Sequence, residues 1–302
     1  MRITNNMLIN TMMLNLSNNL NRTQKYQYQL ATGKRIQLPS DDPIVASKAL
    51  KLRTDVSEIQ QYKRNTDDAL SWMEVTESTM KQITEVMQRM REITNQAANG
   101  TNTGDDILKI QAEAEQLRHQ LIDLANVTYA GRYVFSGYKT DKPLLDANGN
   151  FNIDILNSEQ IKFEIGIGDD INVNVTGSDL FNNGTDALTG EKSGFVDVFD
   201  RVIAAMGSDN KDELSNLLGE LDSQMNNLLR VRAGLGARMN RVELTANRLD
   251  DDYISFTSLM SKNEDVDMAE AIMNLQNEMN VYQASLATGA RVIQPSLVDF
   301  LK

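Results

Sequence analysis

Hydrophobic residues recur every three or four positions over most of this chain, and this spacing predicts amphipathic helices. Alternating steps of three and four give the 3.5-residue period of a coiled coil. The first narrow stripe runs through Ile9, Met13, Leu16, Leu20, Thr23, Gln27 and Leu30, and the last through Ile272, Leu275, Met279, Tyr282 and Leu286. We therefore expect residues 1–40 and 263–302 to form amphipathic end helices that pair with each other.

Two much longer helical stripes lie between the end helices. One runs from Pro43 to about Ala98 without an internal proline or glycine, and the other runs from about Leu214 to Phe256. A helix rises 1.5 Å per residue, so each stripe is longer than a compact domain needs and is typical of a rod. A third helix is predicted over Ile107–Leu124, after an asparagine- and glycine-rich turn. The pattern predicts a long antiparallel coiled-coil rod that comprises residues 41–130 and 195–262.

The hydrophobic period changes to two between residues 131 and 194, which indicates β-strands. Alternating segments are separated by turn sequences such as Asn148-Gly149, and they occupy residues 133–135, 151–155, 161–167 and 171–175. Residues 144–192 hold nine acidic residues against two lysines, so the outer face of this domain should be acidic. The predicted fold class is mainly α, with a small, outward-facing β domain inserted into the rod.

The stretch LATGKRIQLPSDDP separates the first end helix from the rod. Gly33 suits the left-handed end of a helix. Asp42 can cap the next helix through its side-chain oxygen, and Pro43 is favoured at the first helical position. Pro39 is expected to keep the chain extended before the cap. We interpret the stretch as a stiff, capped reversal between two helices.

Composition and charge narrow the class of protein. The net charge is −12, which disfavours a nucleic-acid binder and a protein that docks on an anionic membrane. There is no cysteine, and no apolar run is long enough to span a bilayer. The charge is uneven, because residues 1–40 carry five basic and no acidic residues, whereas residues 263–302 carry six acidic and two basic residues. This complementarity supports pairing of the end helices.

The chain offers no arrangement of residues suited to catalysis. Its only histidine, His119, lies between the stripe positions Leu117 and Leu121 and should face solvent. The Gly33-Lys34 pair lacks the upstream glycine of a phosphate loop, and Arg35 stands where serine or threonine is required. Asp146, Asn148 and Asn150 resemble the start of a calcium loop, but the later ligand positions are wrong. We expect no catalytic, cofactor-binding or metal-binding residues, no cofactor and no enzymatic activity.

Several stretches resemble flagellar axial proteins. These are MRITNNM at the start, LATGKRIQLPSDDPIVASKAL at 30–50, GRYVFSGYKTDKPL at 131–144 and DVDMAEAIMNLQNEMNVYQASLATGARVIQPSLVDFL at 265–301. The form GKRI…PSDDP is similar to that of the hook–filament junction proteins, the flagellar hook-associated protein 3 family, rather than to that of flagellin. The resemblance implies a flagellin-like fold and a structural, non-enzymatic subunit.

The resemblance also implies a route and a set of partners. Without it, the absence of a cleavable signal sequence would suggest a cytosolic protein. Members of the family leave the cell unfolded through the flagellar type III export channel and join the extracellular flagellum. The implied partners are the other hook–filament junction protein, flagellin, further copies of the chain and an export chaperone.

The residue pattern gives this role a mechanism. We expect the end helices to be disordered in the monomer and to fold when neighbouring subunits bury their stripes in an inner tube. The assembly interface would then comprise Ile9, Met13, Leu16, Leu20, Leu30, Ile272, Leu275, Met279, Tyr282 and Leu286. One alternative is flagellin itself, which would form filaments alone. Another is a soluble coiled-coil sensor or secreted effector that uses its β domain for recognition.

Overall fold

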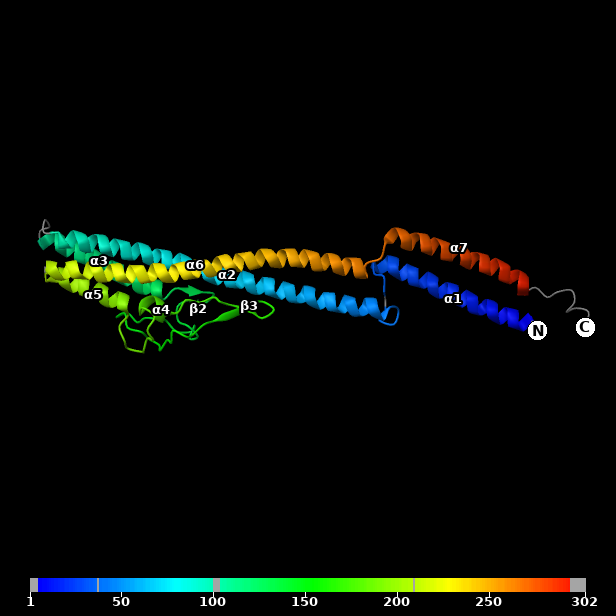
Figure 1. The fold of residues 1–302 in the computed structure, drawn as a ribbon, viewed down its shortest axis with the longest axis horizontal. Helices are drawn as coiled ribbons and strands as arrows, with labels where there is room; N and C mark the ends of the chain where they lie inside the picture. The colour runs from blue at the N-terminus through cyan, green and yellow to red at the C-terminus, as the bar shows by residue number, and fades with distance from the viewer. Residues whose placement is uncertain (1–4, 37, 100–103, 209, 294–302) are drawn as a thin grey trace, which may run out of the picture. The chain divides into compact units, whose positions relative to one another are not determined.

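The computed structural model describes residues 5–36, 38–99, 104–208 and 210–293 (Figure 1). Helices dominate these residues, and the four strands are short, which confirms the predicted fold class. In chain order the elements are α1 (Asn5–Thr32), α2 (Pro43–Ala98), α3 (Gly104–Ala125), β1 (Thr128–Tyr129), β2 (Arg132–Tyr133), β3 (Lys162–Gly166), β4 (Asp169–Asn172), α4 (Gly177–Phe181), α5 (Gly194–Gly207), α6 (Lys211–Glu264) and α7 (Met268–Ile293).

The chain divides into two compact units. Unit 1 comprises Met1–Glu58 and Asp252–Lys302, and unit 2 comprises Ile59–Asp251. Helices α2 and α6 contribute residues to both units. The domain boundaries near residues 40 and 263 stay a prediction: α1 ends at Thr32 and α6 at Glu264, whereas the two compact units divide inside α2 and α6.

The core of unit 2 is a bundle of α2, α3, α5 and α6. Helix α2 contributes a buried stripe of methionine and isoleucine side chains, and α6 faces it with leucines. Five buried threonines on α2 also lie in or beside this core, and each hydroxyl donates a hydrogen bond to the carbonyl four residues earlier, at 2.7–2.8 Å. The hydroxyls are therefore satisfied within their own helix and leave the packing surface apolar.

Ion pairs connect the helices of this bundle along its surface. Glu77 and Arg232 join α2 to α6 at 2.6 Å, and Arg89 and Glu113 join α2 to α3 at 2.6 Å. Ion pairs that remain partly open to solvent, as these two do, contribute little to stability. The buried apolar stripes therefore supply most of the stabilisation, as the spacing of the sequence predicts.

Residues 126–193 form the insert, which holds two separate two-stranded antiparallel sheets, β1–β2 and β3–β4. The predicted strand at residues 151–155 does not form. Its side chains do alternate between buried and exposed, but its backbone makes only isolated bridges, Leu145 to Phe151 and Ile155 to Ala187. The predicted strands at 133–135 and 171–175 are likewise shorter than expected, because they leave their ladders after Tyr133 and Asn172.

The insert is anchored on α6 rather than forming an autonomous domain. Arg230 pairs with Asp179 at 2.7 Å, and Arg241 pairs with Asp169. The Arg238 guanidinium donates to the carbonyls of Asn172 and Asn174 at 3.1 and 3.0 Å. Burial lowers the pKa of Arg238 from its usual value, because its environment solvates the charge less well than water does.

Candidate assembly surface

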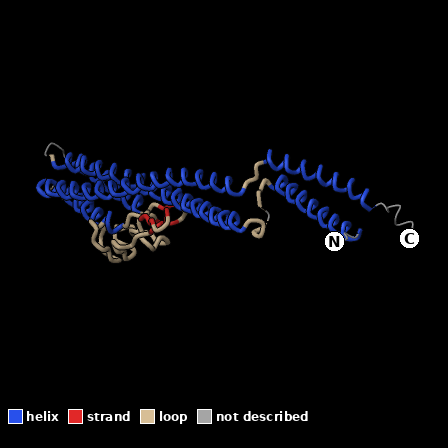
Figure 2. The backbone as a smooth tube through the Cα atoms, turned by 45° about the vertical axis from the view of Figure 1, so that its right-hand side comes forward, coloured by secondary structure: helices blue, strands red, loops and turns tan. Residues whose placement is uncertain are grey.

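Helices α1 and α7 pack against each other in antiparallel fashion along their length (Figures 1 and 2). Three contacts fix the register of the pair: Arg22 Nε to Glu278 Oε1 at 2.9 Å, Asn19 Nδ2 to Ser285 Oγ at 3.2 Å, and the approach of Met12 to Gly289. A Cβ atom at position 289 would lie 1.7 Å from Met12 Cε, so the glycine permits this approach.

The interior of the α1–α7 pair mixes polar and apolar side chains. Asn19 and Thr23 of α1 and Ala271 of α7 are buried, Leu16 is half-buried, and Arg22 donates a further hydrogen bond to Asn19 Oδ1 at 2.6 Å. The Thr23 hydroxyl donates to the Asn19 carbonyl at 2.9 Å. Such hydrogen bonds fix a register, but they supply less burial energy than an apolar contact of the same size.

The structure divides the predicted stripes between two faces. Ile9, Leu16 and Leu30 of α1 and Leu275 and Tyr282 of α7 are half-buried. The other five predicted residues remain 42–57 % exposed, and they are Met13, Leu20, Ile272, Met279 and Leu286. These five therefore lie outside the contact between the two helices, and their place in an assembly interface stays a prediction. The spacing of apolar residues also did not predict that Asn19, Glu278, Ser285 and Gly289 make contacts between the helices. The only sign of polar contacts in the sequence was Thr23, a polar residue within the apolar stripe.

The five exposed residues share one face of the pair. Successive residues advance clockwise by about 100° when a helix is viewed from its N-terminus. Met13 and Leu20 lie clockwise of the α1 residues that face α7, and Ile272, Met279 and Leu286 lie clockwise of the α7 residues that face α1. Because the helices are antiparallel, this rotation brings all five side chains to the same side. We call this surface the ridge.

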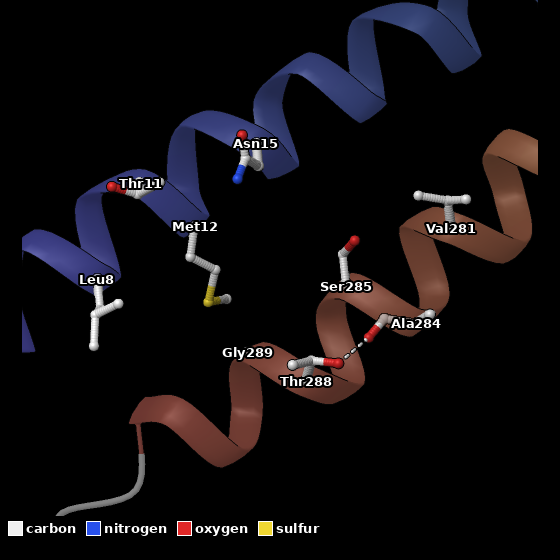
Figure 3. Close-up of a pocket in the computed structure, with 9 residues that line it drawn as sticks. All are labelled: Leu8, Thr11, Met12, Asn15, Val281, Ala284, Ser285, Thr288 and Gly289. Atoms are coloured by element: carbon white, nitrogen blue, oxygen red, sulfur yellow. Dashed lines mark hydrogen bonds between the residues drawn. The ribbon is translucent and has the colours of Figure 1, made fainter.

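A groove lies between the same two helices (Figure 3). Its volume is about 480 Å³, and none of its lining residues carries a charge. The lining residues are Leu8, Thr11, Met12, Asn15, Val281, Ala284, Ser285, Thr288 and Gly289. Met12, Ser285 and Gly289 belong to the helix contact itself, and the others lie counterclockwise of it, on the side opposite the ridge.

The segment between α1 and α2 carries the predicted caps. Gly33 has φ of +69°, and its amide donates to the Gln29 carbonyl at 2.8 Å, which closes α1 in the left-handed conformation. Asp42 Oδ1 accepts from the amides of Ile44 and Val45 at 3.1 Å, and Pro43 is the first residue of α2. These three predictions are confirmed.

One other prediction for this segment is wrong. Pro39 is not in an extended stretch but is the second residue of a turn, in which the Asp41 amide donates to the Leu38 carbonyl at 2.9 Å. The fixed φ of proline suits that position. The interpretation of the segment as a reversal between two helices stays a prediction.

The segment is strapped to the α6–α7 connection by backbone and side-chain contacts. The Arg35 amide donates to the Glu264 carbonyl at 2.8 Å, and the Val266 amide donates to the Gly33 carbonyl at 2.9 Å. The Glu264 carboxylate is buried and accepts from Arg53 Nε at 3.1 Å. Lys34 Nζ lies 2.8 Å from Asp265 Oδ1 and 3.6 Å from Glu264 Oε1. These contacts join the segment that follows α1 to the segment that precedes α7, and we call them the strap.

The strap should weaken in acid. The hydrogen bond from Lys34, followed by that from Ser261, lowers the pKa of Asp265, and the hydrogen bond to Asp265 raises the pKa of Lys34. Asp265 therefore contributes stability above its usual pKa of about 4, and this contribution is lost as the pH falls through its lower folded value. The Lys34 contribution is complete below about pH 10 and is lost as the pH rises through its raised value.

We expect Asp265→Asn to remove part of the acid dependence of unfolding. Thermal unfolding followed by helical circular dichroism from pH 7 to about pH 2 measures it for both chains. Plotted against pH, the unfolding temperatures of the two chains should differ near neutral pH and become equal in acid. The effect should be small, because both side chains are partly exposed. Curves that stay parallel throughout would contradict a role for this carboxylate.

The remaining candidates from the sequence are not brought together. His119 is exposed on α3. Asp146 Oδ1 accepts from the amides of Asn148 and Asn150 at 2.9 and 2.8 Å, so this carboxylate supports the turn at Gly149. Among the described residues, no group of three or more metal-ligating side chains converges, and no helix is long and apolar enough to cross a membrane.

Comparisons with known proteins give consistent matches. The family model of the bacterial flagellin N-terminal helical region matches residues 3–140, and that of the C-terminal helical region matches residues 218–301. Flagellar hook-associated protein 3 of Escherichia coli (strain K12) is 30 % identical, with 94 % of this chain and 95 % of that protein covered. The Salmonella typhimurium protein of the same name is also 30 % identical, with 95 % and 96 % covered.

Solved structures show the same fold. The crystal structure of flagellar hook-associated protein 3 from Legionella pneumophila matches with a TM-score of 0.60 at 18 % identity. The match covers 70 % of this chain and 97 % of that chain.

Proposed function

This chain belongs to the flagellar hook-associated protein 3 family, and on that premise we propose that it is a structural subunit of the junction between the hook and the filament of a bacterial flagellum. The family is structural and non-enzymatic. The role requires surfaces that bind protein neighbours on the axis of the flagellum.

One observation carries the proposal: the α1–α7 pair leaves five of its ten predicted apolar interface residues exposed on one face, while it buries the polar residues Asn19 and Thr23. A helix pair that is stable by itself places its apolar residues between the helices. Here the ridge residues are 42–57 % exposed, while Asn19 and Thr23 are buried. Contiguous exposed apolar surface marks a site of protein interaction. Neighbouring subunits of the junction provide the cover for this surface.

The same arrangement supports coupling of folding to assembly. Fixing the backbone costs about 1–2 kcal/mol per residue, and a pair that leaves half of its apolar stripe exposed offsets little of that cost. The end helices are therefore disordered in the free monomer and become ordered when neighbours cover the ridge. A chain of this kind stays unfolded at its ends for export with a chaperone and polymerises only at the growing structure.

The proposed neighbours follow from the position of the junction. They are the other hook–filament junction protein, flagellin and further copies of this chain. The chain reaches them outside the cell, as a part of the flagellum.

Deleting the gene for this chain from the host bacterium tests the proposal. We expect hooks without attached filaments and flagellin released into the medium, because flagellin subunits arrive at a hook that offers no template. Restoring the chain should restore filaments. Electron microscopy of isolated flagella and analysis of secreted protein measure both results.

Two other outcomes would point elsewhere. Hooks without filaments and without flagellin in the medium would indicate that this chain is the flagellin, as would filaments formed by the purified chain alone. Normal filaments in the deletion strain would overturn the proposal and favour a sensor or secreted effector.

A further inference from the structure

The insert contacts α6 at two places, and a hollow lies between them. At the first place Arg230 pairs with Asp179 at 2.7 Å. About two turns further along α6, Arg238 donates to the carbonyls of Asn172 and Asn174 at 3.1 and 3.0 Å. The hollow has a volume of about 300 Å³, and all of its lining residues belong to the insert or to α6. It therefore lies wholly within unit 2.

Gly234 leaves the α6 side of the hollow without a side chain. It lies four residues from Arg230 and four from Arg238, and it lines the hollow together with them. Among the described residues, a Cβ atom at this position would meet no neighbouring side chain or element within 4 Å. Glycine weakens a helix relative to alanine, and packing within the chain does not require it here. A glycine at such a position allows a ligand to approach the backbone.

The hollow offers more hydrogen-bond donors than acceptors. A guanidinium carries five N–H donors. Arg238 uses its Nε and Nη1 and Arg230 uses its Nε and Nη2, so the remaining Nη atom of each has no acceptor among the described residues. The side-chain amide of Gln160 has no partner in this part of the chain, and Asn172 uses only its Oδ1, which accepts from the Asn174 amide at 3.2 Å. A ligand that satisfies these groups must supply acceptors.

The charges around the hollow favour a carboxylate. Its charged lining residues are two arginines and Asp179, which give a net charge of +1 in a chain whose net charge is −12. Asp179 pairs with Arg230, which leaves the half-buried Arg238 without an ion-pair partner among the described residues. A carboxylate carries one negative charge and fits the fork of a guanidinium. A phosphate group carries nearly two charges at neutral pH and would exceed the charge of the site.

We propose that this hollow binds a small carboxylate, with Arg238 as its ion-pair partner and Gln160 and Asn172 as further donors. The volume is at the lower end of the range for ligand sites, which suits a short organic acid or one acidic side chain of a protein. Because the ligand contacts both the insert and α6, it strengthens the attachment of the insert. The site belongs to unit 2 and does not depend on the proposed function.

Titration of the isotope-labelled, full-length chain, followed by nuclear magnetic resonance, tests the site. Acetate supplies the carboxylate, and acetamide is its neutral counterpart of nearly the same shape. Glutamate blocked at both backbone ends represents an acidic side chain, and blocked glutamine is its neutral counterpart. Inorganic phosphate is the more highly charged oxyanion. Chloride keeps the ionic strength constant, and the backbone amide signals of Asn172 and Gly234 report on the hollow.

Gly234→Met and Gly236→Met form a matched pair of variants. Both replace a glycine of α6 whose Cβ would meet nothing within 4 Å among the described residues, but only Gly234 lines the hollow. Gln160→Ala is a milder variant, because it removes a proposed donor whose side chain is exposed. Circular dichroism verifies that each variant keeps its helix content and its unfolding transition.

We expect acetate and blocked glutamate to shift the two amide signals until they saturate, and acetamide and blocked glutamine to leave them unchanged. Gly234→Met should weaken binding at least about tenfold, and Gln160→Ala about two- to tenfold, the usual range for one hydrogen bond. Gly236→Met should bind as the unmodified chain does. Tighter binding of blocked glutamate than of acetate would assign the carboxylate to a protein partner, and the reverse order would assign it to a free acid.

Three results would overturn the proposal. Equal shifts from acetate and acetamide would show that the hollow does not select charge. Tighter binding of phosphate than of both carboxylates would show that it selects a different oxyanion. Signals that do not saturate with either carboxylate would show that it binds neither. None of these results bears on the proposed function, because the gene deletion does not depend on the hollow.

Discussion

Replacing Met279 and Leu286 together by aspartate is expected to abolish incorporation of the chain into the flagellum while leaving the folded monomer almost intact. Both side chains are more than 40 % exposed in the isolated chain, so a carboxylate there stays hydrated. In an assembly that covers the ridge, each substitution loses about 1.5–3 kcal/mol of apolar burial. Each one also adds a desolvation penalty of several kcal/mol for a buried charge.

These costs make the assembly defect far larger than any defect in folding. Each 1.4 kcal/mol is a factor of ten, so the association constant should fall by more than about a thousandfold. The free energy of unfolding of the monomer should change by no more than about 0.5 kcal/mol, because both sites lie on an end helix that is disordered in the free monomer and adds nothing to its folded core. Immunoblots of purified flagella measure incorporation, and urea denaturation measures the free energy of unfolding.

Asn277→Asp is the matched control for this prediction. It adds the same charge at an exposed position of the same helix, on the side away from both α1 and the ridge. Normal incorporation of this control, together with loss of the double variant, would assign the effect to the ridge. Incorporation of the double variant at the normal level would show that the exposed apolar stripe is not an interface.

Features that depend on local chemistry could be predicted from the sequence. The ends of α1 and α2 follow from Gly33 and Asp42, because a left-handed backbone and a capping oxygen are requirements of single residues. The long helices follow from the spacing of their apolar residues. Pro39 was misplaced because its fixed φ is compatible with both an extended segment and a turn.

The face of each end helix that meets the other could not be predicted from spacing. A narrow stripe with period 3.5 fits a contact within the chain and a contact between chains equally well. The choice depends on Asn19, Arg22, Glu278 and Ser285, whose hydrogen bonds form only when residues more than 250 positions apart come together. Thr23, a polar residue in the stripe, was the one local sign that polar residues lie in this interior.

The insert shows a similar limit. Alternation at residues 151–155 predicted correctly which side chains are buried, but not the hydrogen-bonding partners of the backbone. Those partners, such as Ala187 for Ile155, lie in loops whose positions depend on the whole insert. Period-two burial therefore identifies an extended segment, whereas a ladder requires a neighbour that spacing does not reveal.

Replacing Phe181 by alanine is expected to lower the free energy of unfolding of unit 2 by about 3–5 kcal/mol, the usual cost of emptying a phenylalanine site in a core. Phe181 is fully buried, and its ring meets Phe135 edge-on at 5.8 Å and Phe195 at 5.3 Å between centroids. It therefore joins the insert to the start of α5. The single tryptophan, Trp72, lies in the same core, so urea denaturation followed by its fluorescence measures the loss.

Ile167→Ala is the control, because Ile167 is 87 % exposed between β3 and β4 and its loss should change stability by no more than about 0.5 kcal/mol. The ridge variant should lose assembly and keep its stability, whereas Phe181→Ala should lose stability and keep its ability to assemble. At a temperature where it remains folded, it should enter the flagellum normally, because the ridge and groove belong to unit 1. Failure to enter while folded would mean that unit 2 carries an assembly surface as well, and a stability equal to that of Ile167→Ala would mean that the aromatic cluster does not anchor the insert.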